Sequence, residues 1–62
     1  MVDIVVSNIK LIGRLWDMIA TLTEKRDEEE DLDIRSNYTM AISEMKDAIA
    51  DLTRANENLE EC

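Results

Sequence analysis

Hydrophobic and polar positions follow a helical period over the first third of the chain. Fourteen of the first 22 residues are hydrophobic. The polar residues recur in steps of three and four: Asp3, Ser7, Lys10, Arg14, Asp17, Thr21 and Glu24. This spacing predicts a helix that carries one narrow polar stripe with apolar surface on both sides of it. A helix with so wide an apolar face requires more than one neighbour.

One row within this segment follows the a and d positions of a heptad repeat. It consists of Val5, Asn8, Ile12, Leu15, Ile19 and Leu22. We predict that Ile12, Leu15, Ile19 and Leu22 pack against a second helix of the same chain. Other apolar residues flank the row, Ile9 and Trp16 on one side and Ile4, Leu11 and Met18 on the other. We predict that these five form the interface for self-association or for a partner protein.

A second heptad row follows later in the chain: Ile42, Met45, Ile49, Leu52, Asn56 and Leu59. Its apolar members, Ile42, Met45, Ile49, Leu52 and Leu59, are the predicted other half of the intrachain seam. Ala41, Ala48 and Ala55 form a column beside it, which suits close helix packing or, equally, surface helix propensity. Residues 17–23 and 47–53 share five of seven identities, which is typical of two similar helical units.

The two asparagines are the only polar members of these rows. A polar residue at such a position commonly fixes the register or the oligomeric state of a coiled coil. Asn8 has an alternative interpretation, because Ser7 and Asn8 also suit the N-cap of a helix. In that case residues 1–6 would form an extended arm.

A charged stretch separates the two rows and predicts a turn at about residues 26–31. Lys25 and Arg26 suit the end of one helix, and the acids after them suit the start of the next. Asp27 with Glu30 is a candidate capping box, and the further N-cap candidates are Asp31, Asp33 and Ser36. One unbroken helix is an alternative, but it would need a discontinuity here because the two rows are two residues out of phase. A short strand at residues 2–6 is another alternative, since that run is β-branched.

We therefore predict an all-α fold: an antiparallel helical hairpin that assembles into a homo-oligomeric helical bundle with coiled-coil-like packing. Residues 1–62 form one domain, with helices at about 3–25 and 32–60. A chain of 62 residues buries only about 60% of its unfolded surface, so a lone hairpin would be marginally stable. With one Cys and no His, neither an internal disulfide nor a Cys/His zinc site can compensate. Oligomerisation is the remaining means of stabilising so small a domain.

Charge narrows the choice of partner. The net charge is −8; residues 1–22 are neutral, and residues 23–36 carry seven acids against three bases. An acidic surface formed by Asp27, Glu28, Glu29, Glu30 and Asp31 disfavours direct contact with nucleic acid or anionic membranes. It suits a basic protein partner, or simply keeps the chain solvated. Membrane attachment is the weakest hypothesis, since the first segment lacks a basic polar face.

Candidate chemistry is sparse. The chain has no His, no phosphate-binding glycine loop and no base beside Cys62, and the acidic run lacks the spacing of a calcium loop. We expect no enzyme activity, no cofactor and no metal. Asp3 replaces the basic start of a signal peptide, so we expect a cytoplasmic protein. The expected partner is another copy of the chain, and the expected role is that of an adaptor, assembly element or inhibitor. An acidic decoy that occupies a basic nucleic-acid-binding site is the alternative.

Overall fold

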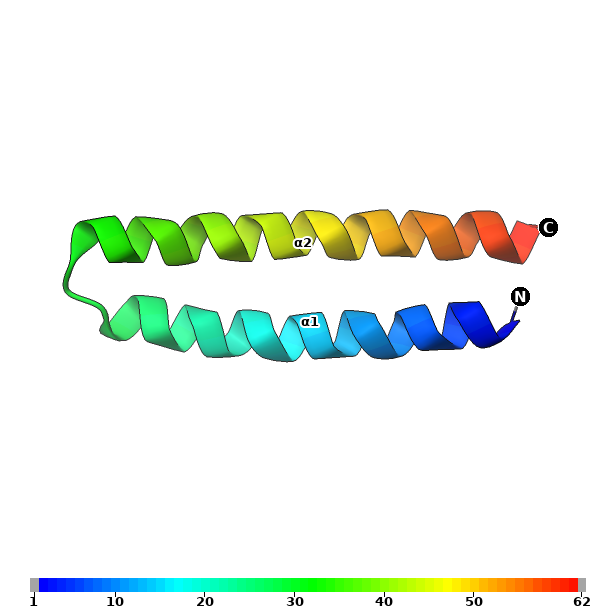
Figure 1. Cartoon of the computed structure of the whole chain (residues 1–62), viewed down its shortest axis with the longest axis horizontal. Coiled ribbons are helices and arrows are strands. Elements are labelled where there is room, and N and C mark those ends of the chain that lie inside the picture. The colour runs from blue at the N-terminus through cyan, green and yellow to red at the C-terminus, as the bar shows by residue number, and fades with distance from the viewer. Residues whose placement is uncertain (1, 62) are drawn as a thin grey trace.

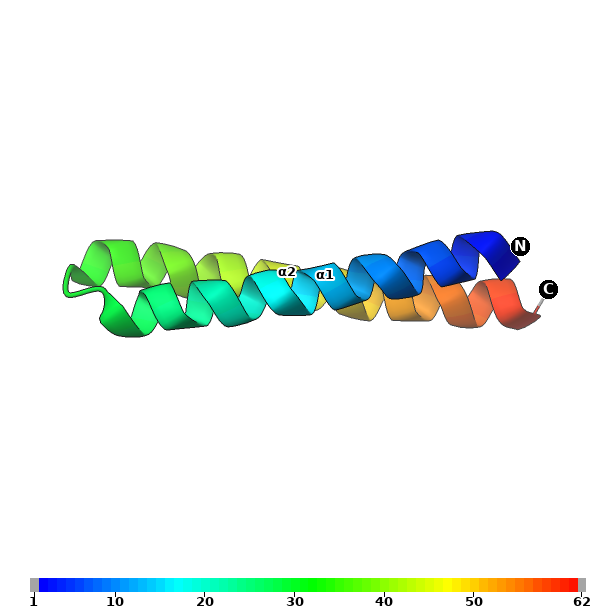
Figure 2. The same ribbon diagram turned by 90° about the horizontal axis from the view of Figure 1, so that it is seen from below.

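Two long helices packed as an antiparallel hairpin make up the fold (Figure 1). In the computed structural model, which describes residues 2–61, α1 runs over Val2–Glu28 and α2 over Leu32–Glu61. The start of α1 lies beside the end of α2, and the linker closes the opposite end of the hairpin. The helices cross at a shallow angle (Figure 2), as in coiled-coil-like packing. The result is a rod of 48 × 14 × 9 Å.

The all-helical hairpin predicted from the sequence is confirmed, and three alternatives are wrong. Residues 2–6 are helical, so they form neither a strand nor an extended arm. The chain is not one continuous helix, because three non-helical residues separate α1 from α2. Compared with the predicted bounds, α1 extends three residues further and ends at Glu28. Lys25 and Arg26 in its last turn favour this end of the helix, because basic side chains oppose the macrodipole there.

The linker, Glu29–Asp31, turns the chain through backbone and carboxylate hydrogen bonds. The Glu29 amide donates to the carbonyl of Arg26 at 3.2 Å, which tightens the last turn of α1. Asp31 is the N-cap of α2, since its Oδ1 accepts from the amides of Asp33 at 2.9 Å and Ile34 at 3.3 Å. Glu29 Oε1 accepts from the Asp31 amide at 3.1 Å. Asp27 lies inside α1, so the candidate capping box of Asp27 with Glu30 is wrong.

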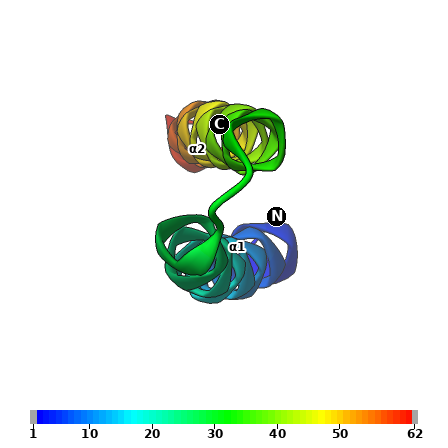
Figure 3. The same ribbon diagram turned by 90° about the vertical axis from the view of Figure 1, so that its left-hand side faces the viewer.

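These bonds also explain how the turn forms without glycine or proline. Among the described residues none adopts a positive φ, so the linker needs no left-handed position. Figure 3 shows the linker passing directly from the end of one helix to the start of the other. Carboxylates that cap amides replace the usual turn residues here.

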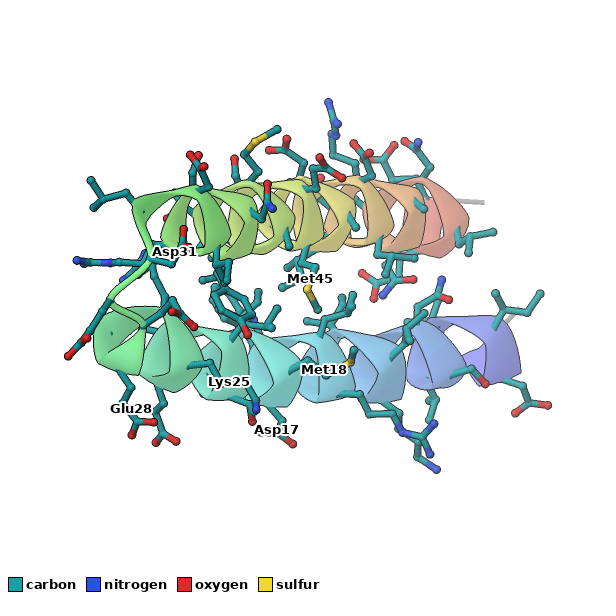
Figure 4. The ribbon with its side chains drawn as sticks, turned by 60° about the vertical axis from the view of Figure 1, so that its left-hand side comes forward. Asp17, Met18, Lys25, Glu28, Asp31 and Met45 are labelled. Atoms are coloured by element: carbon teal, nitrogen blue, oxygen red, sulfur yellow. The ribbon has the colours of Figure 1, made fainter. Side chains whose placement is uncertain are left out.

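The core is a single strip along the facing sides of the two helices. Ile19, Ile42 and Ile49 are buried, with exposed fractions of 5%, 5% and 8%. Four half-buried residues pack against them: Ile12, Leu15, Leu22 and Met45. Leu52 and Leu59 are half-buried further along α2. Met45 points into the space between the helices, whereas Asp17 and Glu28 point away from α2 (Figure 4).

The internal repeat in the sequence has a structural counterpart. Thr23 and Thr53, which are equivalent in the two copies, each donate a hydrogen bond to the carbonyl four residues earlier, at 2.8 Å. The acceptors, Ile19 and Ile49, are both buried. The two helices therefore present the same local unit to the strip between them.

The Asp31 cap gives the first testable prediction. Asp31→Ala should cost about 0.5–2 kcal/mol of folding free energy, because the first amides of α2 lose their acceptor. For a chain of this size, each kcal/mol corresponds to about 4–8 °C in the thermal midpoint. Asp31→Asn is the matched control, since it removes the same charge but keeps a capping oxygen, and it should stay close to wild type. Equal losses in the two variants, measured by circular dichroism melts, would show that the cap contributes nothing.

Candidate interaction surface

One side-chain hydrogen bond crosses between the helices among the bonds identified for the described residues. Asn8 Nδ2 donates to Asn56 Oδ1 at 2.8 Å. Asn56 is 8% exposed, and Asn8 is half-buried. Asn8 lies well inside α1, so its alternative role as a helix N-cap is wrong. The sequence identified both asparagines as interruptions of apolar rows but did not pair them.

This bond defines the register of the hairpin. In an antiparallel pair, each step forward along α1 is matched by one step backward along α2. With Asn8 opposite Asn56, every a residue of one helix therefore faces a d residue of the other. The layers that follow from this register are Val5 with Leu59, Ile12 with Leu52, Leu15 with Ile49, Ile19 with Met45, and Leu22 with Ile42. The predicted seam residues thus line up opposite one another.

A further layer at the closed end was absent from the predicted seam. The same register places Arg26 opposite Tyr38, and both are half-buried. The Arg26 side chain is 31% exposed and pairs with Asp27, Nε to Oδ1, at 3.4 Å. A long aliphatic stem lets arginine cover apolar surface while its charge stays in water. A search for apolar a and d positions passes over such a residue.

The five predicted interface residues all remain exposed in the single hairpin. Their exposed fractions lie between 44% for Leu11 and 57% for Ile9, and the set is Ile4, Ile9, Leu11, Trp16 and Met18. Leu32, Ile34 and Met40 of α2 are exposed large hydrophobics as well. By contrast, only three hydrophobic side chains in the described residues are buried. Among the described residues, more large hydrophobic side chains are thus exposed than buried.

The total accessible surface of the hairpin is also larger than that of a compact chain of the same mass. The accessible area is 4794 Å², whereas a compact monomer of 7.1 kDa exposes roughly 4,100 Å². The radius of gyration is 14.5 Å, against about 10.6 Å for a compact chain of this length. The excess of about 700 Å² reflects the elongated shape of the rod, and it is of the same order as the ~800 Å² that each partner buries in a standard protein–protein interface.

The predicted acidic surface lies at the closed end of the hairpin. Asp27 and Glu28 belong to the last turn of α1, and Glu29, Glu30 and Asp31 form the linker. Four of the five are exposed, and Glu29 is half-buried. Glu29 and Asp31 accept backbone hydrogen bonds, and Asp27 pairs with Arg26. Part of this acidic surface therefore shapes the turn.

Other kinds of site find no support in the described part of the chain. Residues 2–61 contain no group of three or more His, Cys, Asp or Glu side chains placed to hold a metal ion. Within the same residues, neither helix has the length and hydropathy needed to span a bilayer. Cys62, the only thiol, lies outside the described residues, as does Met1.

Comparison with known proteins adds no relative. No protein-family model, curated protein or solved structure matches this chain. Its function has to be inferred from the surface just described.

The asparagine pair yields a prediction about coupling. Asn8→Leu and Asn56→Leu each leave the other amide without its partner, at a cost of about 1–3 kcal/mol that the added apolar group partly offsets. The double variant removes both amides and should recover that cost. Urea unfolding at one fixed protein concentration, read as a double-mutant cycle, should show a coupling of about that size. Strictly additive single effects would mean that the pair does not act as a unit.

Proposed function

We propose that this protein is a non-catalytic adaptor, assembly element or inhibitor that associates with copies of itself and acts through protein–protein contacts. The observation that carries the proposal is the exposed apolar set Ile4, Ile9, Leu11, Trp16 and Met18 beside a core of three buried isoleucines. Side chains of this kind gain about 25 cal/mol for each Å² of apolar surface removed from water. A partner helix can cover part of this set.

The small core supports self-association in particular. No large side chain among the described residues is completely buried. A domain of this size needs additional stabilisation, and a second copy of the chain supplies apolar surface of the same kind. Homo-oligomers with closed symmetry are the most frequent assemblies of soluble proteins. We propose the cytoplasm as the setting of this protein, which the low cysteine content supports.

The non-catalytic part of the proposal rests on the side chains available. The ordinary acid–base residue near neutral pH, histidine, is missing from the sequence. Asp17 and Glu28, two of the exposed carboxylates, point away from α2 (Figure 4). Catalytic groups act in preorganised, water-poor sites, and exposed carboxylates of this kind fit that description poorly.

An acidic decoy is the second candidate function. The observation that favours it is the exposed carboxylate cluster at the closed end, where Asp27, Glu28 and Glu30 all face solvent. Such a surface attracts a basic protein through its field. The engagement of Glu29 and Asp31 in the turn weakens this candidate, because these two carboxylates already have a structural role.

Self-association is tested by sedimentation equilibrium of the wild-type chain under reducing conditions. We expect a mass of two or more chains, because burial of apolar side chains from the exposed set offsets the loss of translational freedom on association. Reducing conditions prevent a disulfide through Cys62 from producing a covalent dimer. A stably folded particle with the mass of one chain, 7.1 kDa, would contradict the proposal.

The decoy hypothesis is tested by neutralising only the acids that do not cap the turn. The triple variant Asp27→Asn, Glu28→Gln, Glu30→Gln keeps Glu29 and Asp31, and so keeps the hydrogen bonds of the linker. We expect its oligomeric mass to equal that of wild type. Its affinity for the native partner should stay within about threefold of the wild-type value, since exposed charges contribute little to affinity. A decoy would lose binding to its basic target and the strong salt dependence of that binding.

A further inference from the structure

The register divides the exposed apolar residues of α1 between two sides of the hairpin. Ile4, Leu11 and Met18 each come one step before an a residue of the seam, whereas Ile9 and Trp16 each come one step after a d residue. These two classes of position lie on opposite sides of a heptad seam. The five residues therefore belong to two separate surfaces.

The corresponding positions of α2 extend the two surfaces differently. Both helices are right-handed, but they run in opposite directions. Followed from N- to C-terminus and seen from one end, one helix therefore turns clockwise and the other anticlockwise, so equivalent heptad positions of the two helices fall on the same side of the seam. Ile4, Leu11 and Met18 thus share a side with Ala41, Ala48 and Ala55, and we call this surface the alanine flank. Ile9 and Trp16 share a side with Thr39, Lys46 and Thr53, and we call this surface the tryptophan flank.

Only the alanine flank is apolar across both helices. Leu11 and Met18 are 44% and 54% exposed there. Ala41 and Ala48 are half-buried and Ala55 is exposed. On the tryptophan flank, the α2 half is made of hydroxyl groups and the exposed ammonium of Lys46. Burying that charge, which lies midway along the flank, without a partner would cost free energy. The alanine flank carries a charge only near the closed end of the hairpin, where the exposed Lys25 precedes Arg26.

We propose that the alanine flank is the surface on which a second copy of this chain docks, and that the tryptophan flank stays open in the assembly. This inference rests on the proposed function and specifies its interface. A two-fold interface uses the same patch on both copies, so the patch must be complementary to itself. Large side chains from α1 beside small ones from α2 meet this condition, because the alanines leave room for Leu11 and Met18 of the other copy.

The available area fits one such interface per chain. The excess accessible surface of about 700 Å² lies just below the ~800 Å² per partner of a standard interface. A flank that spans both helices provides a continuous patch, whereas the apolar part of the tryptophan flank is confined to α1. Two copies joined through their alanine flanks form a four-helix bundle in which each seam gains a covered side.

The test compares two double variants that are matched in charge and in exposure. Leu11→Glu/Met18→Glu alters the alanine flank, and Ile9→Glu/Trp16→Glu alters the tryptophan flank. All four positions are between 44% and 57% exposed in the single hairpin, and none belongs to its seam. Glutamate is also a good helix former, so the substitutions favour helix as well as the original residues do.

We expect sedimentation equilibrium to show that the alanine-flank variant associates at least about thirtyfold more weakly than wild type, as for loss of central interface residues. The tryptophan-flank variant should keep the wild-type mass. Dissociation of the tryptophan-flank variant, alone or together with the other, would overturn this inference but leave self-association standing. A monomeric wild type would instead remove the proposed function itself.

A measurement on the unmodified protein covers the case in which a variant fails to fold. In the assembly we propose, the Trp16 indole faces water, so acrylamide should quench its fluorescence equally well above and below the association midpoint. Trp16 is the only tryptophan, which makes the signal unambiguous. Protection of the indole at high protein concentration would place the tryptophan flank in the interface and overturn the inference.

Discussion

Two helices packed side by side touch along a single strip, and a side chain on that strip keeps an open side on either flank. This constraint explains which side chains of the hairpin are buried and which remain partly exposed. Ile19, Ile42 and Ile49 reach burial because they occupy the middle of the strip. Their neighbours Leu15 and Leu22 sit on the same strip and remain half-buried. A hairpin built in this way leaves its core partly uncovered, and we propose that association covers the rest.

Polar groups supply the specificity that this apolar strip lacks. Leucine and isoleucine layers tolerate a shift by one heptad, since each layer resembles the next. The Asn8–Asn56 bond does not tolerate it, because a shifted register would leave a buried amide without a partner. The carboxylates of Glu29 and Asp31 act in the same way at the turn, where they satisfy amides that would otherwise be unpaired.

The sequence predicted the elements well because heptad spacing depends only on helical geometry. Both rows followed from spacing, and a turn near residues 26–31 followed from the charged stretch between them. What it could not provide was information carried by the tertiary arrangement. The pairing of Asn8 with Asn56 can be predicted only once the register is known, and the half-burial of Arg26 only once Tyr38 is known to lie opposite.

The end of α1 differs from the prediction because Asp27 and Glu28 are acids, which the macrodipole disfavours in the last turn of a helix. The helix nevertheless continues through both residues. The division of the exposed residues into two flanks likewise becomes meaningful only once α2 is in place.

The central claim is that the hairpin completes its core by association, so folding and association should be linked. The most direct measurement is the thermal midpoint of helix loss as a function of protein concentration. We expect the midpoint to rise steadily over about a hundredfold increase in concentration, because binding to the folded state stabilises it by mass action. A midpoint that stays constant over that range, in a chain that is fully helical at the lowest concentration, would contradict the account.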